Sequence, residues 1–522
     1  MKFLIIDGYT DEPAGLGVPP YIGTYPRYVA GVIYKNKYCV DYITIDKLRE
    51  LIKYQNFNFN KYNIIICICG FHTPGKYLNA NPATLREFVY LLHNFNGIKI
   101  LGGPVATKFG SSSQGGQLKD ESKLKYFFDI VAEENLELVV EDLITNNFNL
   151  EKINNFNNNN NRNINSKEYY NKIKDYAVYG AKIIQQHPNY PYIVNEIETY
   201  RGCSRNYSGG CSFCTEPRRF GSPVFREVKD IINEIKSLSN YGAKYYRIGK
   251  QPCIYSYYSK DSEKHDIPIP NPEIIEKLFK NISKYNPEVL HIDNGNPAVI
   301  SYYPQQCKEI TKTLVKYCTS GNVVAFGVES FDEKVIKKNN LFTTYENVLN
   351  ATTIVNEIGK QYGENGMPKL LPGINLLFGL KGETKETFEI NYNCLKEIYN
   401  KDLLLRRINI RQVVPFLNTE ITENDIKKAE KRKNLFKGFK EKVRKDIDNK
   451  MLIKMLPVGH ILKNVFVELK EKDNLYFGRQ FGSYPLLIGI ESSDNLKIGS
   501  FVNVKITNYG RRSITGKIIN IS

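Results

Sequence analysis

The stretch RGCSRNYSGGCSFCTEPR, residues 201–218, places three thiols near one another, at Cys203, Cys211 and Cys214. Their spacing is C-x7-C-x2-C, and glycine and serine are frequent in the loop that joins them. The chain has 10 cysteines among 522 residues, which is too dilute for a disulfide scaffold, and only this set is tightly clustered. The cluster therefore indicates a metal site.

The number of thiols in this loop favours iron and sulfur over zinc. A structural zinc ion takes four protein ligands, and the next cysteine, Cys253, lies 39 residues beyond Cys214. Iron-sulfur clusters are held by thiolates, and three of them would leave one iron open. The loop thus predicts a [4Fe-4S] cluster, with zinc ligands or incidental core thiols as the alternative.

Outward from this loop, short apolar runs alternate with helical segments from about residue 195 to 420. With the strand before Cys203, the expected strands make six β/α units: 245–249, 289–293, 323–328, 373–379 and 405–414. Such units predict an α/β fold with a partial barrel, whose chemistry takes place at the C-terminal ends of the strands. His291 and Cys253 are interpreted mainly as core residues, although both lie near strand ends.

Residues 195–420 resemble the core of radical S-adenosylmethionine (SAM) enzymes. Phe213, just before Cys214, matches the family's C-x-aromatic-C ending, whereas the first gap is longer than in the commonest spacing, C-x3-C-x2-C. A similar long gap occurs in the radical SAM lyase of archaeosine biosynthesis. The resemblance implies a cluster held by Cys203, Cys211 and Cys214, SAM as second cofactor, and ferredoxin or flavodoxin as electron donor.

Three further motifs stand at expected strand ends. Gly249 to Pro252 (GKQP) occupy the place of the family's turn that holds the SAM amino group, with Gln251 instead of glutamate. Gly327, Glu329 and Ser330 resemble a G-x-E-S strand end near the SAM ribose, and residues 379–384 (GLKGET) resemble a later turn. The resemblance implies five SAM-binding residues and assigns no catalytic residue: Gly249, Gln251, Pro252, Glu329 and Ser330.

The N-terminal part contains three apolar runs, at 2–7, 64–69 and 98–101, which predict an open parallel, Rossmann-like sheet. It resembles the cobalamin-binding domains of many radical SAM enzymes, and Gly102 and Gly103 match their glycine turn. The D-x-H-x-x-G cobalt-ligand motif is absent. Tail-inserting cobalamin binding and an empty Rossmann-like domain therefore both remain open.

The N-terminal cysteines are expected to pack rather than to bind metal. Cys67 and Cys69 alternate along one apolar run, and Cys39 lies in a different segment. Two-cluster methylthiotransferases hold a second cluster with three N-terminal cysteines. We therefore expect about four irons per chain rather than eight.

The C-terminal part changes to short strands with glycine turns, which predicts a small β-barrel. Residues 497–507 (KIGSFVNVKIT) resemble the TRAM domain of tRNA-modifying enzymes, an oligonucleotide-binding-like module. The resemblance implies RNA contacts from four side chains: Lys497, Lys505, Arg511 and Arg512. An ordinary domain with solvated lysines is the alternative.

The charge follows the same division. The formal net charge is +17, and residues 427–450 hold 11 basic and 4 acidic side chains.

Between 146 and 165, 12 of 20 residues are Asn, which predicts a linker or surface loop. The expected organisation is a Rossmann-like domain (1–145), a linker and helix (146–190), the radical SAM core (191–425), a basic helix (426–451) and a TRAM-like barrel (452–522).

No window has about 18 uninterrupted apolar residues, and the N-terminus has no signal-peptide pattern, so a cytoplasmic protein without a membrane anchor is expected. The sequence favours a radical SAM enzyme that modifies RNA, with tRNA as the expected substrate, by methylation, sulfur insertion or a lyase step. Modification of a protein or small cofactor is the alternative. An RNA-binding protein with a structural metal is a third, non-enzymatic reading.

Overall fold

The computed structural model describes residues 1–9, 20–54, 57–70, 81–107, 112–114, 117–119, 122–153 and 166–521. Residues 154–165, the greater part of the predicted Asn-rich linker, lie outside these ranges. The chain divides into two compact units. The first comprises residues 1–199, 224–246 and 416–418, and the second comprises residues 200–223, 247–415 and 419–522.

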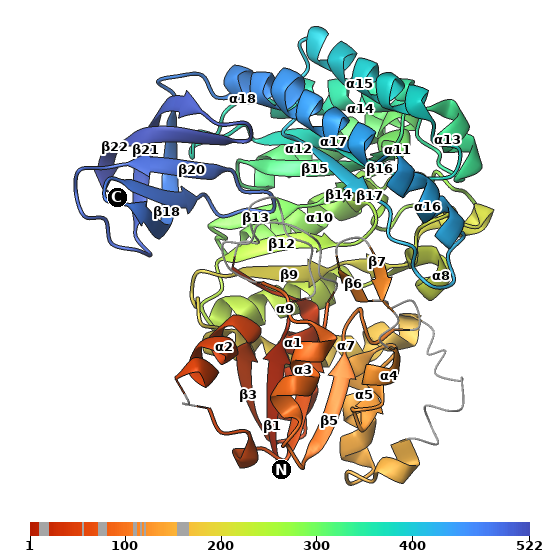
Figure 1. Cartoon of the computed structure of the whole chain (residues 1–522), viewed down its shortest axis with the longest axis vertical. Coiled ribbons are helices and arrows are strands. Elements are labelled where there is room, and N and C mark those ends of the chain that lie inside the picture. Colours follow the sequence, from red (N-terminus) through yellow and green to blue (C-terminus); the bar gives the residue numbers. More distant parts are fainter. Residues whose placement is uncertain are drawn as a thin grey trace. The chain divides into compact units, whose positions relative to one another are not determined.

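The first unit is built on a parallel sheet with the strand order β3-β1-β4-β5-β8 (Figure 1). Its strands are β1 (Lys2–Asp7), β3 (Cys39–Thr44), β4 (Ile64–Ile68), β5 (Ile98–Gly102) and β8 (Ile130–Val131). Every residue of β4 is buried, as expected for a central strand covered on both faces. The three predicted apolar runs are confirmed as β1, β4 and β5.

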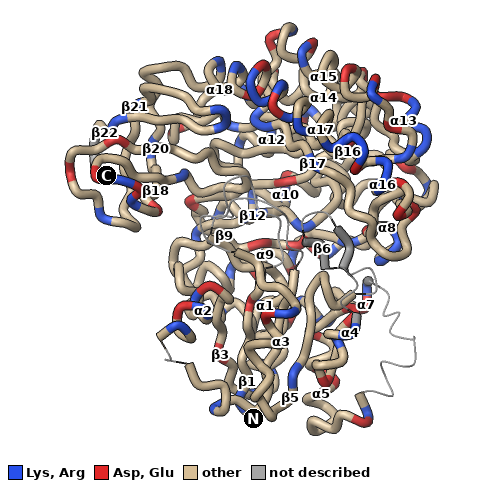
Figure 2. The backbone as a smooth tube through the Cα atoms, in the orientation of Figure 1, with Lys and Arg blue, Asp and Glu red and all other residues tan. Residues whose placement is uncertain are grey.

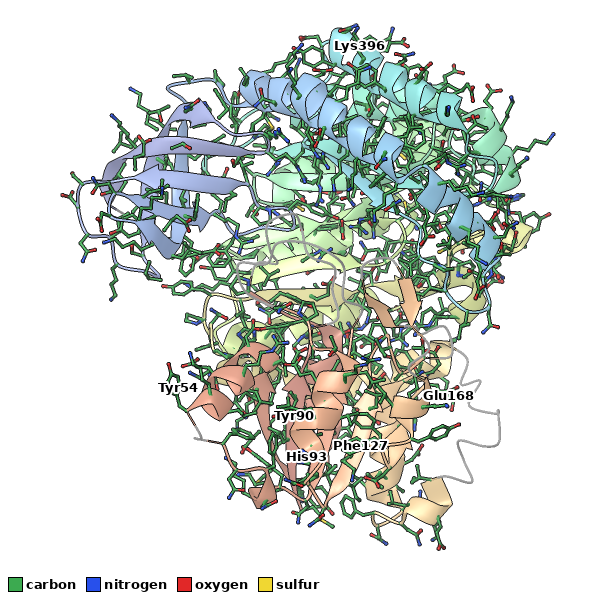
Figure 3. The ribbon with its side chains drawn as sticks, viewed as in Figure 1. Tyr54, Tyr90, His93, Phe127, Glu168 and Lys396 are labelled. Atoms are coloured by element: carbon green, nitrogen blue, oxygen red, sulfur yellow. The ribbon has the colours of Figure 1, made fainter. Side chains whose placement is uncertain are left out.

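Helices pack on this sheet and on one another. They include α1 (Thr24–Lys35), α2 (Ile45–Lys53), α3 (Leu85–Leu92), α5 (Leu136–Thr145), α7 (Ser166–Gly180) and α9 (Val228–Asn240). The buried Glu234 on α9 pairs with both Arg27 of α1 and Arg226. On α3, Tyr90 and His93 stack with ring centroids 6.1 Å apart at the exposed side of the helix (Figure 3).

The second unit contains a parallel sheet of β14 (Asn294–Gly295), β15 (Asn322–Glu329), β16 (Leu370–Phe378) and β17 (Arg407–Gln412). Two strands precede β14 in the chain, β12 (Tyr245–Lys250) and β13 (Val289–Ile292). The first two residues of β12 belong to the first unit and the others to the second. Four long helices alternate with these strands: α10 (Pro272–Ser283), α12 (Pro304–Tyr317), α14 (Tyr345–Gly359) and α15 (Lys385–Asn400). The predicted β/α alternation is thus confirmed.

The basic segment, expected as one helix over 426–451, forms three helices: α16 (Glu423–Lys431), α17 (Lys433–Val443) and α18 (Asn449–Met455). A π-helical turn, Arg444–Asp448, joins the last two, and such turns accommodate one extra residue per turn. Figure 2 shows lysines and arginines gathered along these helices. No helix in the described ranges is both long and apolar enough to traverse a lipid bilayer.

The chain ends in a closed five-stranded barrel with the order β18-β19-β20-β22-β21. Its strands are β18 (Ile461–Lys472), β19 (Leu475–Arg479), β20 (Leu487–Glu491), β21 (Phe501–Tyr509) and β22 (Ser513–Ile521). The apolar interior of the barrel continues into Leu371 of β16 and into Leu452 and Met455 of α18. The predicted small β-barrel is confirmed. Its core is continuous with residues of β16 and α18, which belong to the same unit.

Candidate functional site: the cysteine loop

Close backbone packing shapes the start of the cysteine loop. Gly202 has φ +83°, and a Cβ there would lie 2.3 Å from the carbonyl oxygen of Ser222. The Cys203 N–H donates to the Gly221 carbonyl at 3.0 Å. After the 3-10 turn Ser204–Ser208, Gly209 and Gly210 both adopt positive φ. The glycines let the chain reverse between the first thiol and the other two.

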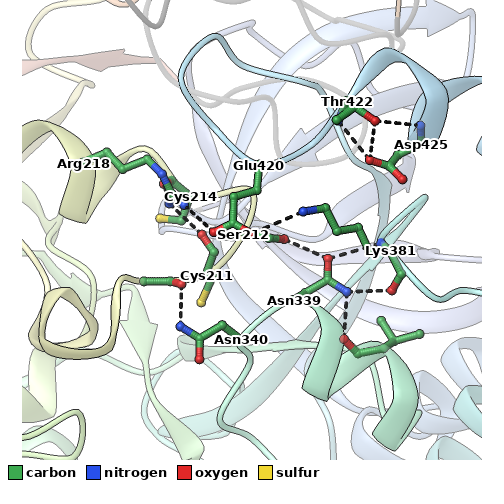
Figure 4. A network of polar contacts seen from close by, with 12 residues as sticks. Cys211, Ser212, Cys214, Arg218, Asn339, Asn340, Lys381, Glu420, Thr422 and Asp425 are labelled. Carbon is green, nitrogen blue, oxygen red and sulfur yellow. Dashed lines mark hydrogen bonds and ion pairs between the residues drawn. The ribbon is translucent and has the colours of Figure 1, made fainter.

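An arginine and an asparagine fix the second half of the loop (Figure 4). Arg218 donates from Nη1 to the carbonyl oxygens of Cys211 and Cys214, both at 2.8 Å. Its other terminal nitrogen lies 3.1 Å from Glu420 Oε1. Asn340 donates to the Gly210 carbonyl at 2.8 Å. These bonds hold the backbone around both thiols without using the thiols themselves.

Asn339, which follows helix α13 (Glu333–Lys338), joins the same loop to the turn after β16. Its Oδ1 accepts from the Ser212 hydroxyl at 2.8 Å, and the Ser212 N–H donates to its carbonyl at 3.0 Å. Its amide donates to the Lys381 carbonyl at 2.8 Å. Cys211 and Phe213 pack on a small apolar cluster: Val335, Leu341, Leu380, Val413 and Ile421. The loop is therefore fixed on one side, and apolar side chains keep water from that side.

The three thiols of the loop act on one another's pKa. Burial raises the pKa of Cys203 to about 12, with a smaller contribution in the same direction from Cys211. Burial also raises the pKa of Cys214, to which Cys211 and Cys203 both add. Arg205 and Arg218 act in the opposite direction on the pKa of Cys211. Bare thiolates are thus unfavourable here, and bound metal together with these arginines would stabilise them.

The arrangement of the three thiols bears on the kind of metal centre that they could hold. Across the described ranges, no three or more His, Cys, Asp or Glu side chains form a group that could hold a single metal ion. A cubane cluster makes a different demand, because each thiolate binds a different iron and the sulfurs stand further apart. Three thiols on one fixed loop, without the close grouping that a single zinc ion needs among the described residues, are compatible with a cluster.

Glu329 ends β15 near this loop. It has φ +64°, unusual for a side chain other than Gly, Asn or Asp, and follows a register shift between Gly327 and Glu329. Burial raises the pKa of its carboxyl to about 8, and its charge in turn raises the pKa of Cys211. Strained backbone at a strand end is frequent at functional sites. Ser330, next in the chain, is buried, and its hydroxyl accepts from the Asp332 N–H at 3.1 Å.

The predicted SAM turn follows β12 directly. Gly249 lies in the strand, and Gln251 is buried, with its amide donating to the Ile248 carbonyl at 2.9 Å. Its own carbonyl accepts from Asn294 at 3.0 Å. Pro252 lies in the turn that follows. These contacts fix the turn, while the assignment of its residues to SAM stays a prediction.

Cys253 and His291 behave as core residues. Cys253 is buried, and its sulfur accepts from the Asn296 N–H at 3.2 Å. His291 Nδ1 accepts from the Ser483 N–H at 3.0 Å, and Nε2 lies 3.3 Å from the Ser320 carbonyl. Burial lowers the pKa of His291 to about 4, so the ring is neutral at pH 7. The neutral ring joins β13 to the loop between β19 and β20.

In the first unit, the two predicted cobalamin glycines pack against the chain itself. A Cβ at Gly102 would lie 2.4 Å from Leu136 Cδ2, and one at Gly103 would lie 2.7 Å from the Cys69 carbonyl oxygen. Close packing therefore accounts for both glycines. The segments that follow β1, β4 and β5 include residues 10–19, 71–80 and 108–111, which lie outside the described ranges.

The four residues predicted to bind RNA take two kinds of position. Lys497, Lys505 and Arg511 are exposed. Arg512 is half-buried, and its Nε lies 3.8 Å from Asp448 Oδ2 in the π-helical turn. The structure thus brings Arg512 to the junction with α17 and α18 and leaves the other three on the barrel surface.

Sequence reasoning did not identify Arg218, Asn339 and Asn340 as supports of the loop. Arg218 lies four residues after Cys214, within the motif itself, and the asparagine pair follows the Glu329 strand closely in the chain. The Arg218 contacts with the two carbonyls are local, whereas those of Asn339 and Asn340 join segments more than 100 residues apart, which spacing alone does not reveal.

The region around the cysteine loop matches the model of a known protein family. The radical SAM superfamily profile matches residues 197–394. An uncharacterized protein of Methanocaldococcus jannaschii is 64% identical over 519 residues, which cover 99% of this chain and 93% of that protein. One of Archaeoglobus fulgidus is 37% identical over 521 residues, covering 99% and 89%.

Two more distant similarities complete the comparison. The ribosomal protein uS12 methylthiotransferase RimO of Clostridioides difficile is 22% identical over 334 residues, covering 63% of this chain and 67% of that protein. The radical SAM methyltransferase TsrM from Kitasatospora setae, solved with cobalamin and a [4Fe-4S] cluster, is 13% identical with a TM-score of 0.50. That alignment covers 80% of this chain and 76% of TsrM and indicates a shared fold.

Proposed function

We propose that this chain, which is a radical SAM enzyme and belongs to one family with the Methanocaldococcus jannaschii and Archaeoglobus fulgidus proteins, modifies RNA, with tRNA as its substrate. The observation that carries the chemistry is the fixed loop with three neighbouring thiols. When bound, a [4Fe-4S] cluster and SAM supply a radical that removes hydrogen from an unactivated carbon. The protein's own contribution is to bind and orient the cofactors and the substrate and to exclude water from them.

Cys203, Cys211 and Cys214 are the proposed cluster ligands. Arg218 keeps the carbonyls of the last two turned toward itself and places its positive charge beside Cys211. Apolar packing under Cys211 and Phe213 excludes water from one side of the loop. Gly249, Gln251 and Pro252, together with Glu329 and Ser330, are proposed to bind SAM because both groups stand at C-terminal strand ends, where barrel enzymes place their substrates.

Methylation is the reaction we favour. Sulfur insertion by a two-cluster route needs three further thiols that converge, and Cys39 and Cys67 occupy opposite ends of the sheet in the first unit. In register, Cys39 pairs with Lys2 and Cys67 with Ile6 on β1. Cobalamin as methyl carrier in the first unit is part of this proposal. It is supported by the Rossmann-like strand order and not by Gly102 and Gly103.

RNA as substrate is supported by the C-terminal part of the chain. A closed five-stranded barrel is an architecture that binds oligonucleotides in other proteins. Its exposed Lys497, Lys505 and Arg511 suit phosphate contacts, and lysines and arginines gather along α16 to α18 (Figure 2). The TRAM resemblance belongs to the same proposal.

A protein substrate is the second candidate, because RimO, whose name describes a ribosomal protein as its substrate, is similar to part of this chain. The deciding experiment is nucleoside mass spectrometry of tRNA from a strain that lacks the gene. One missing modified nucleoside, restored by the wild-type gene and not by a Cys211→Ala gene, is expected. A complete set of tRNA nucleosides, with methyl label from SAM found in protein instead, would contradict the RNA proposal.

A further inference from the structure

A second group of charged residues lies within the second unit, away from the cysteine loop. It comprises Arg406 and Arg407 at the start of β17, Lys440 and Arg444 near the end of α17, and Arg512 in the turn between β21 and β22. We refer to these five residues as the basic recess. In register, Arg407 is level with Gly373 and Ala325, whereas Glu329 lies four residues further along β15, ~13 Å away along the strand. The basic recess therefore includes the N-terminal end of β17 and is separate from the cluster site.

The five cations act on one another. Besides burial, the guanidinium of Arg407 lowers the pKa of Arg406. Partial burial lowers the pKa of Lys440, and Arg444 and Arg512 act in the same direction. Burial, followed by Arg444, Arg407 and Arg406, lowers the pKa of Arg512 to about 9, against the opposite effect of Asp448. Like charges of this number repel one another unless anions lie among them.

The acidic groups at this place balance only part of the charge. Asp448 pairs with Arg444 and lies 3.8 Å from Arg512. Asp293 is near Arg407, but it already pairs with Arg247 and accepts a hydrogen bond from Tyr484. Asp448 and the shared Asp293 therefore leave an excess of positive charge among the described residues of the basic recess.

Two guanidinium nitrogen atoms of the basic recess can still donate a hydrogen bond. Arg407 is buried, and the Nε atoms of Arg406 and Arg407 have no hydrogen-bond partner among the residues that the structure describes. Arg406 donates from Nη2 to the Tyr484 carbonyl at 2.8 Å, and Arg407 stacks on the Tyr484 ring with its Cζ 4.2 Å from the centroid. Leaving buried charged donors without partners is costly. Both guanidinium groups are thus held in place by Tyr484, and each keeps an Nε–H that could donate to a ligand.

The recess is reachable from solvent. Arg512 keeps 36% of its side-chain surface exposed, and Lys440 is exposed on α17. Arg406 is half-buried, and Arg407 lies deepest. Exposure thus falls from Lys440 and Arg512, which solvent reaches, to the buried Arg407.

We propose that the basic recess is a binding site for a phosphate group. Planar guanidinium groups recognise phosphate oxygens through paired hydrogen bonds, and a phosphate with about two negative charges would balance much of the excess. The phosphate belongs either to the backbone or end of a nucleic acid or to a small phosphorylated molecule. The site does not depend on RNA being the substrate, because its charge and unfilled donors stand on their own.

The test uses the full-length protein and inorganic pyrophosphate, with chloride at matched ionic strength as reference. Pyrophosphate is expected to raise the thermal midpoint more than chloride does, and titration calorimetry should show saturable binding. Arg512→Gln should weaken this binding roughly tenfold, as expected for the loss of one charge-assisted hydrogen bond. The matched control is Arg511→Gln, which removes the same charge from the neighbouring exposed residue and should leave the affinity unchanged.

Lys440→Gln provides a second variant that is expected to fold, because its side chain is exposed. It should weaken pyrophosphate binding by a smaller factor. No difference between pyrophosphate and chloride, or an equal loss in Arg511→Gln and Arg512→Gln, would overturn the site.

A tRNA transcript distinguishes the two sources of the phosphate. If the group belongs to nucleic acid, pyrophosphate competes with the transcript, and Arg512→Gln weakens transcript binding more than Arg511→Gln does. If it belongs to a small molecule, pyrophosphate binding responds to Arg512→Gln while the two variants affect transcript binding equally. Specific pyrophosphate binding without any transcript binding would leave the recess standing and contradict the proposed RNA substrate.

Discussion

Replacing Cys39, Cys67 and Cys69 together by alanine should leave the iron content at about four per chain. The structure gives the reason, because these thiols cannot converge. Cys39 is level with Lys2 and Cys67 with Ile6, so four residues, or ~13 Å of strand, separate them along the sheet. Cys39 is exposed, whereas Cys67 and Cys69 are buried in the apolar core.

The same geometry gives the cost of the substitution. Removing each buried sulfur costs about 1 kcal/mol, as for a buried methylene group, and removing the exposed one costs little. The triple variant should therefore lose about 2 kcal/mol, which lowers the melting temperature by several degrees without preventing folding. Burial raises the pKa of Cys67 well above that of a free thiol, which also disfavours a metal-binding thiolate there.

The assay is iron and acid-labile sulfide per chain after anaerobic reconstitution. Wild type and the triple variant should give the same value, and Cys211→Ala, a single substitution in the cysteine loop, should give almost none. A reproducible eight irons in the wild type, or a loss of iron in the triple variant, would refute the reasoning and favour sulfur insertion.

Three further predictions follow from residues of the two units. Cys203→Ala and Cys214→Ala should each remove the broad cluster absorbance near ~400 nm and all 5'-deoxyadenosine formation, and SAM cleavage by a variant lacking all three loop thiols would contradict the assignment. Arg218→Gln should keep the thiols but release the Cys211 and Cys214 carbonyls, so a chelator should remove iron faster than from the wild type; an unchanged rate would argue against its positioning role. Burial raises the pKa of Asp7 from 3.8 to about 6, so the folded state holds a proton that the unfolded state releases, and stability falls as pH rises between these values. Asp7→Asn should abolish a loss of about 3 kcal/mol over that window, measured by denaturant unfolding; an unchanged pH profile would contradict it.

Most of the fold could be predicted from the sequence because its strands are apolar runs with clear ends. β4 reads IIICI and is buried throughout, and the GKQP turn follows β12 where the alternation of strands and helices places it. The three clustered thiols were equally visible, since their spacing lies within one loop. Patterns that lie within one segment of the chain can be recognised without knowing which distant segments pack against it.

The rest depends on contacts between distant segments. Arg407, Lys440 and Arg512 meet only because the barrel packs on the core, and nothing in their own surroundings in the chain distinguishes them from solvated basic residues. Asp293 pairs with Arg247 and accepts a hydrogen bond from Tyr484, and Tyr484 lies in the β19–β20 loop, which is distant in the chain. The π-helical turn between α17 and α18 likewise begins at Arg444, whose Nη1 makes a long-range contact by donating to the Ile408 carbonyl at 2.6 Å.

The contact of Ser483 with His291 and Ile292 has a consequence for biosynthesis. Ser483 donates from its hydroxyl to the Ile292 carbonyl at 3.0 Å, across 191 positions of the chain. Ribosomes extend chains from the N-terminus at about 5–20 residues per second, so β13 leaves the ribosome many seconds before the segment that covers it. During that interval the strand ends of the core stay open to water and to other nascent chains. A premature stop codon near the end of the gene would thus yield a chain that has every cluster thiol and an unfinished interior, a substrate for quality-control proteases and not a shortened enzyme.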